Sequence, residues 1–152
     1  MIEMRPIAVV RNKRHSADDD RWGDVVSTIE LLDPLGEDAL LGIENFSHVE
    51  ILFYFDQAQE KQVETGSRHP RGNPDWPRLG ILAQRGKDRP NHIGATICPL
   101  IGHNEKTITV RALDAIDGTP VLDIKPVMSE FLPDEEIHQP DWVGQLMKHY
   151  WK

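Results

Sequence analysis

The chain of 152 residues contains a single cysteine, Cys98. One cysteine excludes an intrachain disulfide and any metal or iron–sulfur site built from several cysteines. Long apolar runs are also absent, and the longest uncharged one, Ile51–Phe55, is far too short to span a bilayer. The segment from Met1 to Arg5 lacks the apolar stretch of a secretory signal. We therefore expect a cytoplasmic protein in a reducing compartment, with no membrane segment and no bound metal.

Basic residues are in deficit. The sequence has 17 Lys and Arg against 25 Asp and Glu, a formal net charge of −8. A protein that binds nucleic acid without specificity usually carries a basic excess, so this balance argues against that class. The cations nevertheless cluster, with Arg85, Lys87 and Arg89 in one short turn, whereas Asp18–Asp20 and Asp134–Glu136 gather acids elsewhere. A local patch for a phosphate-bearing partner therefore stays open.

Glycine-rich nucleotide fingerprints are missing: the sequence shows neither G-x-G-x-x-G nor a Walker loop. Short runs rich in β-branched and aromatic residues follow one another instead, with little helix between them. They are Pro6–Arg11, Val25–Leu32, Phe46–Phe55, Gly80–Ala83, Ile93–Ile101, Thr107–Ala112 and Val121–Lys125. This pattern predicts a mainly β protein, a small single-domain β-barrel with a few short helices.

Other segments predict the connections. Residues 12–24 and 57–78 are polar and are expected to form long loops, which are often functional in compact domains. Glu37–Leu41 predicts a short helix, and the spacing of apolar residues from Trp142 to Trp151 predicts one terminal helix. Because Phe46–Phe55 ends as a continuous apolar run, we expect that strand to be buried on both faces.

The segment Gly80–Gly94 holds the densest group of cations. Pro90 fixes the backbone of the Arg89–Asn91 turn, and Asn91 can bond its own backbone. Two interpretations stay open: a solvated charged loop, or a rigid loop that presents guanidinium groups to an anion or a base. Gly94 suggests a bulge or a close backbone approach.

Two further segments carry polar side chains beside apolar strands. Asp117-Gly118 is a hairpin signal, which turn chemistry alone explains. Asp123 and Lys125 either face solvent or form a partly buried pair. His48 and Glu50 share one strand face, where they can serve as cross-strand hydrogen-bonding partners.

Taken in order, five of these blocks resemble the TsaA/TrmO-like family of S-adenosylmethionine-dependent tRNA methyltransferases. The blocks are Pro6–Arg11, Gly42–His48, Ile51–Phe55, Arg89–Asn91 with Ile93-Gly94, and Asp117–Val121 with Asp123–Pro126. The resemblance spans roughly residues 5 to 127, the expected barrel core, and leaves 128–152 as a C-terminal extension. It implies a barrel that binds S-adenosylmethionine without a Rossmann fold, in a homodimer.

The resemblance also implies where the cofactor would lie. The matching positions are Arg21 and Trp22 in the first long loop, Asp56 and Gln57 after the apolar strand, Arg85, Ala95, and Asp114, Ala115, Ile116, Asp117 and Gly118. Asp117 and Asp114 are the candidate catalytic residues, because a carboxylate can stabilise a sulfonium or take a proton from an attacking amine. Arg89, Asn91 and His48 are the candidate substrate-binding residues.

The implied activity is N-methylation of a modified adenosine in tRNA, of the threonylcarbamoyladenosine type. Several matching positions depart from the family pattern: Asp56 stands in place of a histidine, and only Arg21 survives in the first loop motif. The C-terminal region of full-length tRNA enzymes has no counterpart in this sequence. Two alternatives therefore stay open: a noncatalytic cofactor-binding or RNA-associated module, and a methyltransferase of a small molecule.

Overall fold

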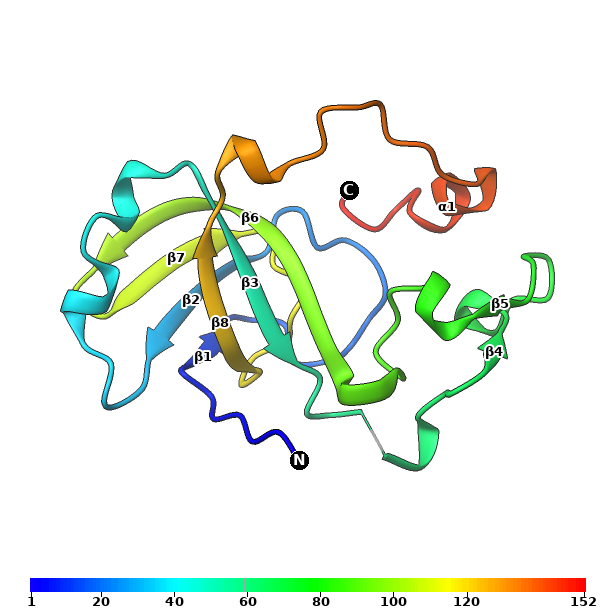
Figure 1. Ribbon diagram of the computed structural model, residues 1–152, viewed down its shortest axis with the longest axis horizontal. Helices are drawn as coiled ribbons and strands as arrows, with labels where there is room; N and C mark the ends of the chain where they lie inside the picture. The colour runs from blue at the N-terminus through cyan, green and yellow to red at the C-terminus, as the bar shows by residue number, and fades with distance from the viewer. Residues whose placement is uncertain (59) are drawn as a thin grey trace.

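Six antiparallel strands close into a barrel in the computed structural model, which describes residues 1–58 and 60–152. The strand order around the barrel is β1-β2-β7-β6-β3-β8 (Figure 1). The strands are β1 (Ala8–Arg11), β2 (Val26–Leu31), β3 (His48–Tyr54), β6 (Ile93–Asn104), β7 (Thr107–Arg111) and β8 (Pro120–Pro126). The predicted mainly β barrel with few short helices is confirmed.

The remaining elements are small. A separate two-stranded sheet pairs β4 (Ser67–Arg68) with β5 (Leu79–Gly80). The 3-10 turns are η1 (Glu37–Leu40), η2 (Ile43–Asn45), η3 (Glu60–Gln62), η4 (Pro70–Gly72), η5 (Ile81–Ala83), η6 (Pro90–His92) and η7 (Ser129–Phe131). The strand predicted over Gly80–Ala83 is therefore wrong beyond Gly80, where the chain turns into η5. No helix in the described ranges is both long and apolar enough to cross a membrane.

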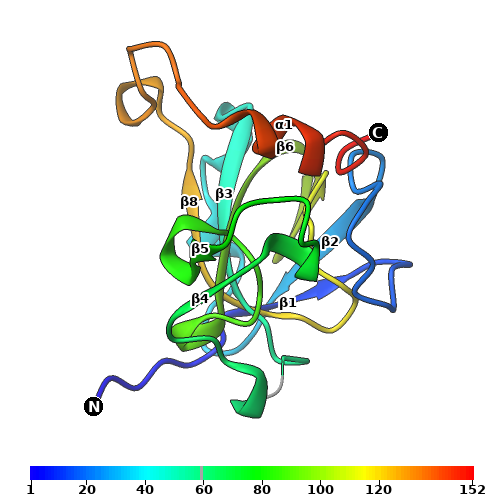
Figure 2. The same cartoon turned by 90° about the vertical axis from the view of Figure 1, so that its right-hand side faces the viewer.

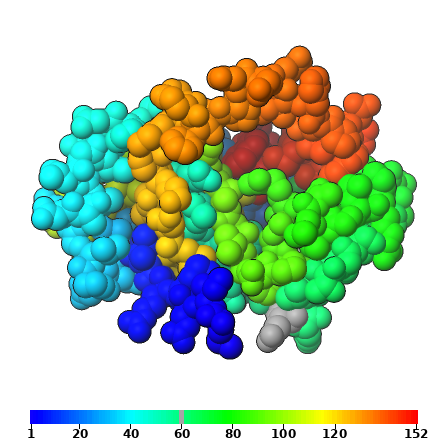
Figure 3. Space-filling model, in the orientation of Figure 1, coloured from blue at the N-terminus to red at the C-terminus, as the bar shows by residue number. Residues whose placement is uncertain are grey.

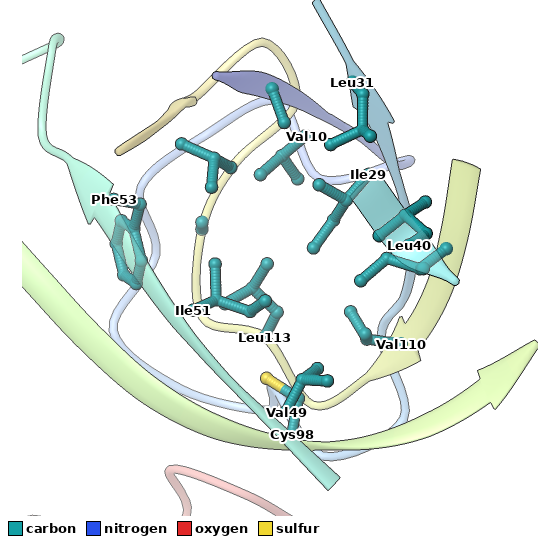
Figure 4. Close-up of a cluster of buried hydrophobic side chains, with 14 residues drawn as sticks. Val10, Ile29, Leu31, Leu40, Val49, Ile51, Phe53, Cys98, Val110 and Leu113 are labelled. Atoms are coloured by element: carbon teal, nitrogen blue, oxygen red, sulfur yellow. The ribbon is translucent and has the colours of Figure 1, made fainter. Parts of the chain in front are cut away.

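The core fills the barrel interior, and it explains why the strands alternate. Along β3 the residues at Val49, Ile51 and Phe53 are buried, while those between them are only half-buried. The expectation that this strand is buried on both faces is wrong, because among the described residues no layer of helices covers the outer face of the barrel. Figure 4 shows these side chains meeting Val10 and Leu113 inside the barrel.

One rim of the barrel collects three long connections. Since neighbouring strands are antiparallel, β1, β3 and β7 end where β2, β6 and β8 begin. The connections over residues 12–25, 55–92 and 112–119 therefore all open at the same rim. Residues that are far apart in sequence are brought together there by strand direction alone.

The C-terminal part of the chain returns to this rim. After β8, residues 132–140 run exposed to α1 (Asp141–Leu146), which lies beside the lobe that carries β4 and β5 (Figures 1 and 2). The indole nitrogen of Trp76 in that lobe donates to Gln145 Oε1 at 3.0 Å. The single terminal helix predicted as far as Trp151 is wrong, because the helix ends at Leu146 and residues 149–151 pair with residues 21–23.

Candidate functional site at one barrel rim

The carboxylate of Asp114 lies at the centre of the rim cluster. Thr96 Oγ1 donates a hydrogen bond to Asp114 Oδ1 at 2.5 Å, and the Tyr150 hydroxyl donates to Oδ2. Strand periodicity aims Thr96 at this carboxylate, since Gly94 and Cys98, two positions away on either side, are buried in the barrel. Three segments thus meet on one acid.

Asp117 lies three residues further on and organises the first long loop. Its Oδ1 accepts a hydrogen bond from the Asn12 amide at 3.1 Å, and its own amide donates to the Arg14 carbonyl at 2.7 Å. His15 Nδ1 lies 3.6 Å from Asp117 Oδ2. The side chain of Asn12 also donates to Ala115 O and Ser27 Oγ. Both candidate catalytic acids therefore lie in one hydrogen-bonded region.

Arg14 and Trp22 build the interior of the first loop. The guanidinium of Arg14 lies 3.9 Å from the centre of the Trp22 ring, and it donates to the carbonyls of Arg21 and Asp20. Trp22 is 3% exposed, and its indole nitrogen donates to Asp18 O. In this structure Trp22 is thus a packing residue whose ring is covered by Arg14, while Arg21 is exposed.

Cations face the acids from the second loop. Arg85 Nη2 donates to Ala95 O at 2.6 Å, which places this guanidinium one residue from Thr96. Arg71 pairs with Asp20 at 3.1 Å. Burial raises the pKa of Tyr150, and the negative charge of Asp114 and the hydrogen bond to it act in the same direction, while Arg71 and Arg85 oppose them. The rim therefore carries charges of both signs around one phenol.

Cys98 lies on the inner side of the same cluster. Burial, and to a smaller extent the charge of Asp114, raise the pKa of its thiol to about 12. Such a thiol stays protonated and unreactive in the folded protein. We therefore assign Cys98 a packing role within the core.

The structure does not bring every predicted site residue into this cluster. Asp56 and Gln57 lie exposed beyond the end of β3 at the same rim. Arg89 donates to the Gln84 carbonyl at 2.6 Å within its own loop, and Asn91 is exposed with a positive φ of 65°. His48 begins β3 at the opposite end, about 20 Å from that rim at the usual rise of about 3.3 Å per residue.

Some backbone groups of the 114–118 turn are engaged within the protein. Ala115 is buried, and its carbonyl accepts from Asn12. The Ile116 carbonyl accepts from Thr119, and the amide of Gly118, whose φ is 83°, donates to Val10 O. Besides its remaining backbone groups, the turn offers the two carboxylates of Asp114 and Asp117 to a ligand.

Sequence reasoning missed several participants in the cluster. They are Asn12, Arg14, Arg71, Thr96 and Tyr150. Strand alternation could have singled out Thr96, because a polar residue stands there on the inward face of a strand. No local pattern marks Tyr150, whose position depends on contacts between distant segments.

Two cavities lie outside the Asp114 cluster, one at the other end of the barrel and one at this rim. One of about 390 Å³ opens at the other end of the barrel between Leu35, Phe46 and Ile124, and another of about 240 Å³ lies between Gly23, Arg111 and Trp151. Figure 3 shows a surface hollow between the segment after β8 (orange) and the lobe of β4 and β5 (green), with C-terminal residues (dark red) on its floor. Within residues 1–58 and 60–152, no three potential ligands among His, Cys, Asp and Glu gather as a metal site would require.

The fold and this cluster define a class: a small closed antiparallel barrel with a charged cluster, built from loops, at one rim. Residues 17–132 match the tRNA-methyltransferase O N-terminal domain family. The match covers most of the chain, and the chain belongs to this family.

Named relatives and a solved structure agree with that assignment. The chain is 41% identical over 115 residues to the tRNA (adenine(37)-N6)-methyltransferase of Escherichia coli, across 70% of this chain and 48% of that protein. It is 32% identical over 131 residues to an S-adenosyl-L-methionine-binding protein of Archaeoglobus fulgidus, across 84% of this chain and 90% of that one. The crystal structure of TrmO from Pseudomonas aeruginosa superposes with a TM-score of 0.75 at 28% identity, over 93% of this chain and 62% of that chain. The chain spans about half the length of the Escherichia coli enzyme.

Proposed function

We propose that this protein binds S-adenosylmethionine at the Asp114 rim and transfers its methyl group to an adenine nitrogen in tRNA. The observation that carries the proposal is the convergence of Asp114, Asp117 and Arg85 in one region of a barrel that belongs to the tRNA-methyltransferase O N-terminal domain family. A relative named as an S-adenosyl-L-methionine-binding protein shares most of its length with this chain and supports the cofactor.

The residues present suit the chemical groups of this cofactor. An exposed guanidinium such as that of Arg85 can hold a carboxylate through two parallel hydrogen bonds. Carboxylates accept hydrogen bonds from ribose hydroxyls and stabilise a neighbouring positive charge. Asp114 and Asp117 are both half-buried, so their charges act at reduced dielectric while still meeting solvent on one side. One guanidinium and two carboxylates therefore fit a ligand that consists of an amino acid joined to a nucleoside.

Methyl transfer requires that the acceptor nitrogen is held in position and that it loses one proton. Bound S-adenosylmethionine supplies a methyl group on a sulfonium sulfur, which departs as a neutral thioether as the new nitrogen–carbon bond forms. Holding the acceptor nitrogen in line with that methyl carbon supplies much of the rate enhancement, as in other reactions between two bound partners. Asp117 or Asp114 takes the proton that the acceptor nitrogen loses. Arg71 holds the carboxylate of Asp20 through an ion pair, and Arg85 holds the carboxylate of the cofactor.

A tRNA acceptor is supported by relatives and by the distribution of charge. The relative from Escherichia coli is named for methylation of adenine 37 of tRNA. On this chain Lys87 and Asn91 are exposed at the rim beside Arg85, where a phosphate could be held. We propose the threonylcarbamoyl form of that adenosine as the acceptor, with Arg89 and Asn91 as substrate contacts; His48, at the opposite end of β3, is too far from the rim to take part.

A homodimer and a cytoplasmic location complete the proposal. Apolar side chains stand exposed on two segments: Ile97 and Ile101 on β6, and Phe131 and Ile137 in the segment after β8. Apolar surface of this kind favours contact with a second copy. Sedimentation analysis of the purified protein would give the oligomeric state.

Calorimetric titration with S-adenosylmethionine tests the cofactor assignment. We expect binding by the unaltered protein and a loss of roughly ten- to a hundredfold in affinity for Arg85→Ala and for Asp117→Ala, because each removes a charge-assisted contact worth about 1.5–3 kcal/mol. Exposed residues away from the rim supply matched controls, Arg5→Ala and Asp38→Ala, which should bind as the unaltered protein does. Absence of binding at millimolar cofactor would refute the proposed function. Unchanged affinity in both rim variants would refute only the position of the site.

Transfer of labelled methyl groups then identifies the acceptor. The protein is incubated with labelled cofactor and total tRNA, and separately with a pool of small metabolites. Labelled tRNA supports the proposal, and digestion to nucleosides shows which base carries the label. Label only in small molecules would assign a small-molecule methyltransferase, and tight binding with no acceptor would assign a binding module.

A further inference from the structure

The segment 149–151 is seated on the first long loop by consecutive backbone hydrogen bonds. The amides of Arg21, Trp22 and Gly23 donate to the carbonyls of His149, Tyr150 and Trp151 at 2.9, 2.8 and 2.8 Å. The Tyr150 ring packs edge-on against the Trp151 ring, with centroids 4.8 Å apart. This pairing fixes the backbone of residue 150 and so directs its side chain.

Gly23 is what lets the two segments approach so closely. A Cβ atom built at residue 23 would lie 2.0 Å from the Trp151 carbonyl oxygen and 3.0 Å from its carbonyl carbon. Both neighbours are backbone atoms, so no side-chain rotation relieves the clash. A side chain at position 23 would therefore displace segment 149–151, and Tyr150 with it.

The side chain directed by this pairing ends on Asp114. A carboxylate offers about four lone-pair positions. Thr96 uses one on Oδ1 and the Tyr150 hydroxyl uses one on Oδ2, which leaves one free on each oxygen. Two donors on different oxygens fix the plane of the carboxylate, and the free lone pairs then point in set directions.

We propose that Tyr150 is a positioning residue of the rim site, which orients the Asp114 carboxylate toward bound S-adenosylmethionine while Gly23 and segment 149–151 hold it there. The inference rests on the proposed function. It extends that function to Tyr150, which lies outside the family match over residues 17–132. Burial, together with the charge of Asp114, raises the pKa of the Tyr150 phenol, so the hydroxyl stays protonated and able to donate.

Two variants separate the hydroxyl from the segment that carries it. Tyr150→Phe removes the hydroxyl and keeps the ring, and Gly23→Ala displaces the segment without altering any side chain at the site. The matched controls are Tyr54→Phe, at an exposed tyrosine on β3, and Gly36→Ala, where an added Cβ meets no atom within 4 Å. We expect both test variants to bind S-adenosylmethionine roughly tenfold more weakly by calorimetry, and both controls to bind unchanged.

A double-substitution cycle distinguishes positioning from packing. If Tyr150 acts through Asp114, Tyr150→Phe weakens binding in the unaltered protein but adds no further loss in an Asp114→Ala background. Thermal unfolding of the same four proteins reports stability separately. An equal loss of affinity in both backgrounds would overturn the inference, because the effect would then bypass Asp114.

Three other results would also overturn it. Unchanged affinity in Tyr150→Phe and Gly23→Ala, with normal binding by the unaltered protein, would refute the inference and leave the proposed function standing. Tighter binding by these variants would show that Tyr150 competes with the cofactor for Asp114. If the unaltered protein fails to bind, the proposed function fails, and the inference that rests on it fails as well.

Discussion

Substituting Gly94 by alanine tests how tightly the barrel is closed around Phe53. Gly94 pairs with Phe53 across β3 and β6, and a Cβ atom at residue 94 would lie 2.5 Å from two carbons of the Phe53 ring and 3.0 Å from a third. The ring is 1% exposed and packs edge-on against Phe55, with centroids 5.2 Å apart. It therefore has no free volume into which it can retreat.

The expected cost follows from this geometry. An extra methyl group in a well-packed core usually costs about 1–3 kcal/mol, and contacts this short place Gly94→Ala at the upper end of that range. In a chain of this size each kcal/mol lowers the melting temperature by about 2–4 °C, so we expect a decrease of roughly 5–10 °C. Thermal unfolding followed by circular dichroism measures it.

Suitable controls share the chemistry of the substitution but not the contact. Gly36→Ala adds the same methyl group where no atom lies within 4 Å, and its melting temperature should change little. Phe53→Leu should partly relieve the cost of Gly94→Ala, since it removes the ring that the methyl group meets. If Gly94→Ala melts within about 1 °C of the unaltered protein, the packing argument is refuted.

Further predictions concern the buried thiol of Cys98 and His48, which lies at the end of the barrel opposite the Asp114 cluster. Because burial raises the pKa of Cys98 to about 12, we expect its thiol to resist a disulfide reagent at pH 8 in the folded protein and to react on unfolding; fast labelling without unfolding would contradict its burial. The stability contributed by the neutral thiol is full below about pH 9 and declines as pH rises toward 12, so the free energy of unfolding, measured with denaturant, should fall more steeply over that range than in Cys98→Ala. For His48→Ala we expect unchanged affinity for S-adenosylmethionine in calorimetry, because the residue lies at the opposite end of β3; a tenfold loss would place the site elsewhere.

The barrel could be predicted because its signals are local. Alternation in stretches such as Thr107–Arg111 follows from the two-residue period of a strand, and that period persists in any sheet the strand joins. Predictions that depended on which element packs against a strand were less accurate. The apolar run of β3 suggested two buried faces, yet only one is fully buried, since in the part of the chain that the structure describes no layer of helices covers the other face.

The rim cluster was predictable in part for a similar reason. Strand order and antiparallel direction bring the 112–119 turn and the first loop to one end, so Asp114, Asp117 and the first loop lie at one rim once the strands are known. Trp22 is a different case, because its covering by Arg14 depends on how the loop folds on itself. Tyr150 lay in a segment whose apolar spacing predicts helix, and tertiary pairing with Arg21–Gly23 overrides that preference.

The sequence by itself determined the barrel class, the absence of a disulfide within the chain, and the segments from which a site could be drawn. These follow from composition and from periodicities that act over a few residues. Only the tertiary structure decided that Thr96 and Tyr150 share one carboxylate, that Trp22 packs beneath Arg14, and that His48 lies at the far end of its strand. The physical reason is that hydrogen bonds between segments more than a hundred residues apart, such as that from Gly23 to Trp151, depend on how the whole chain closes.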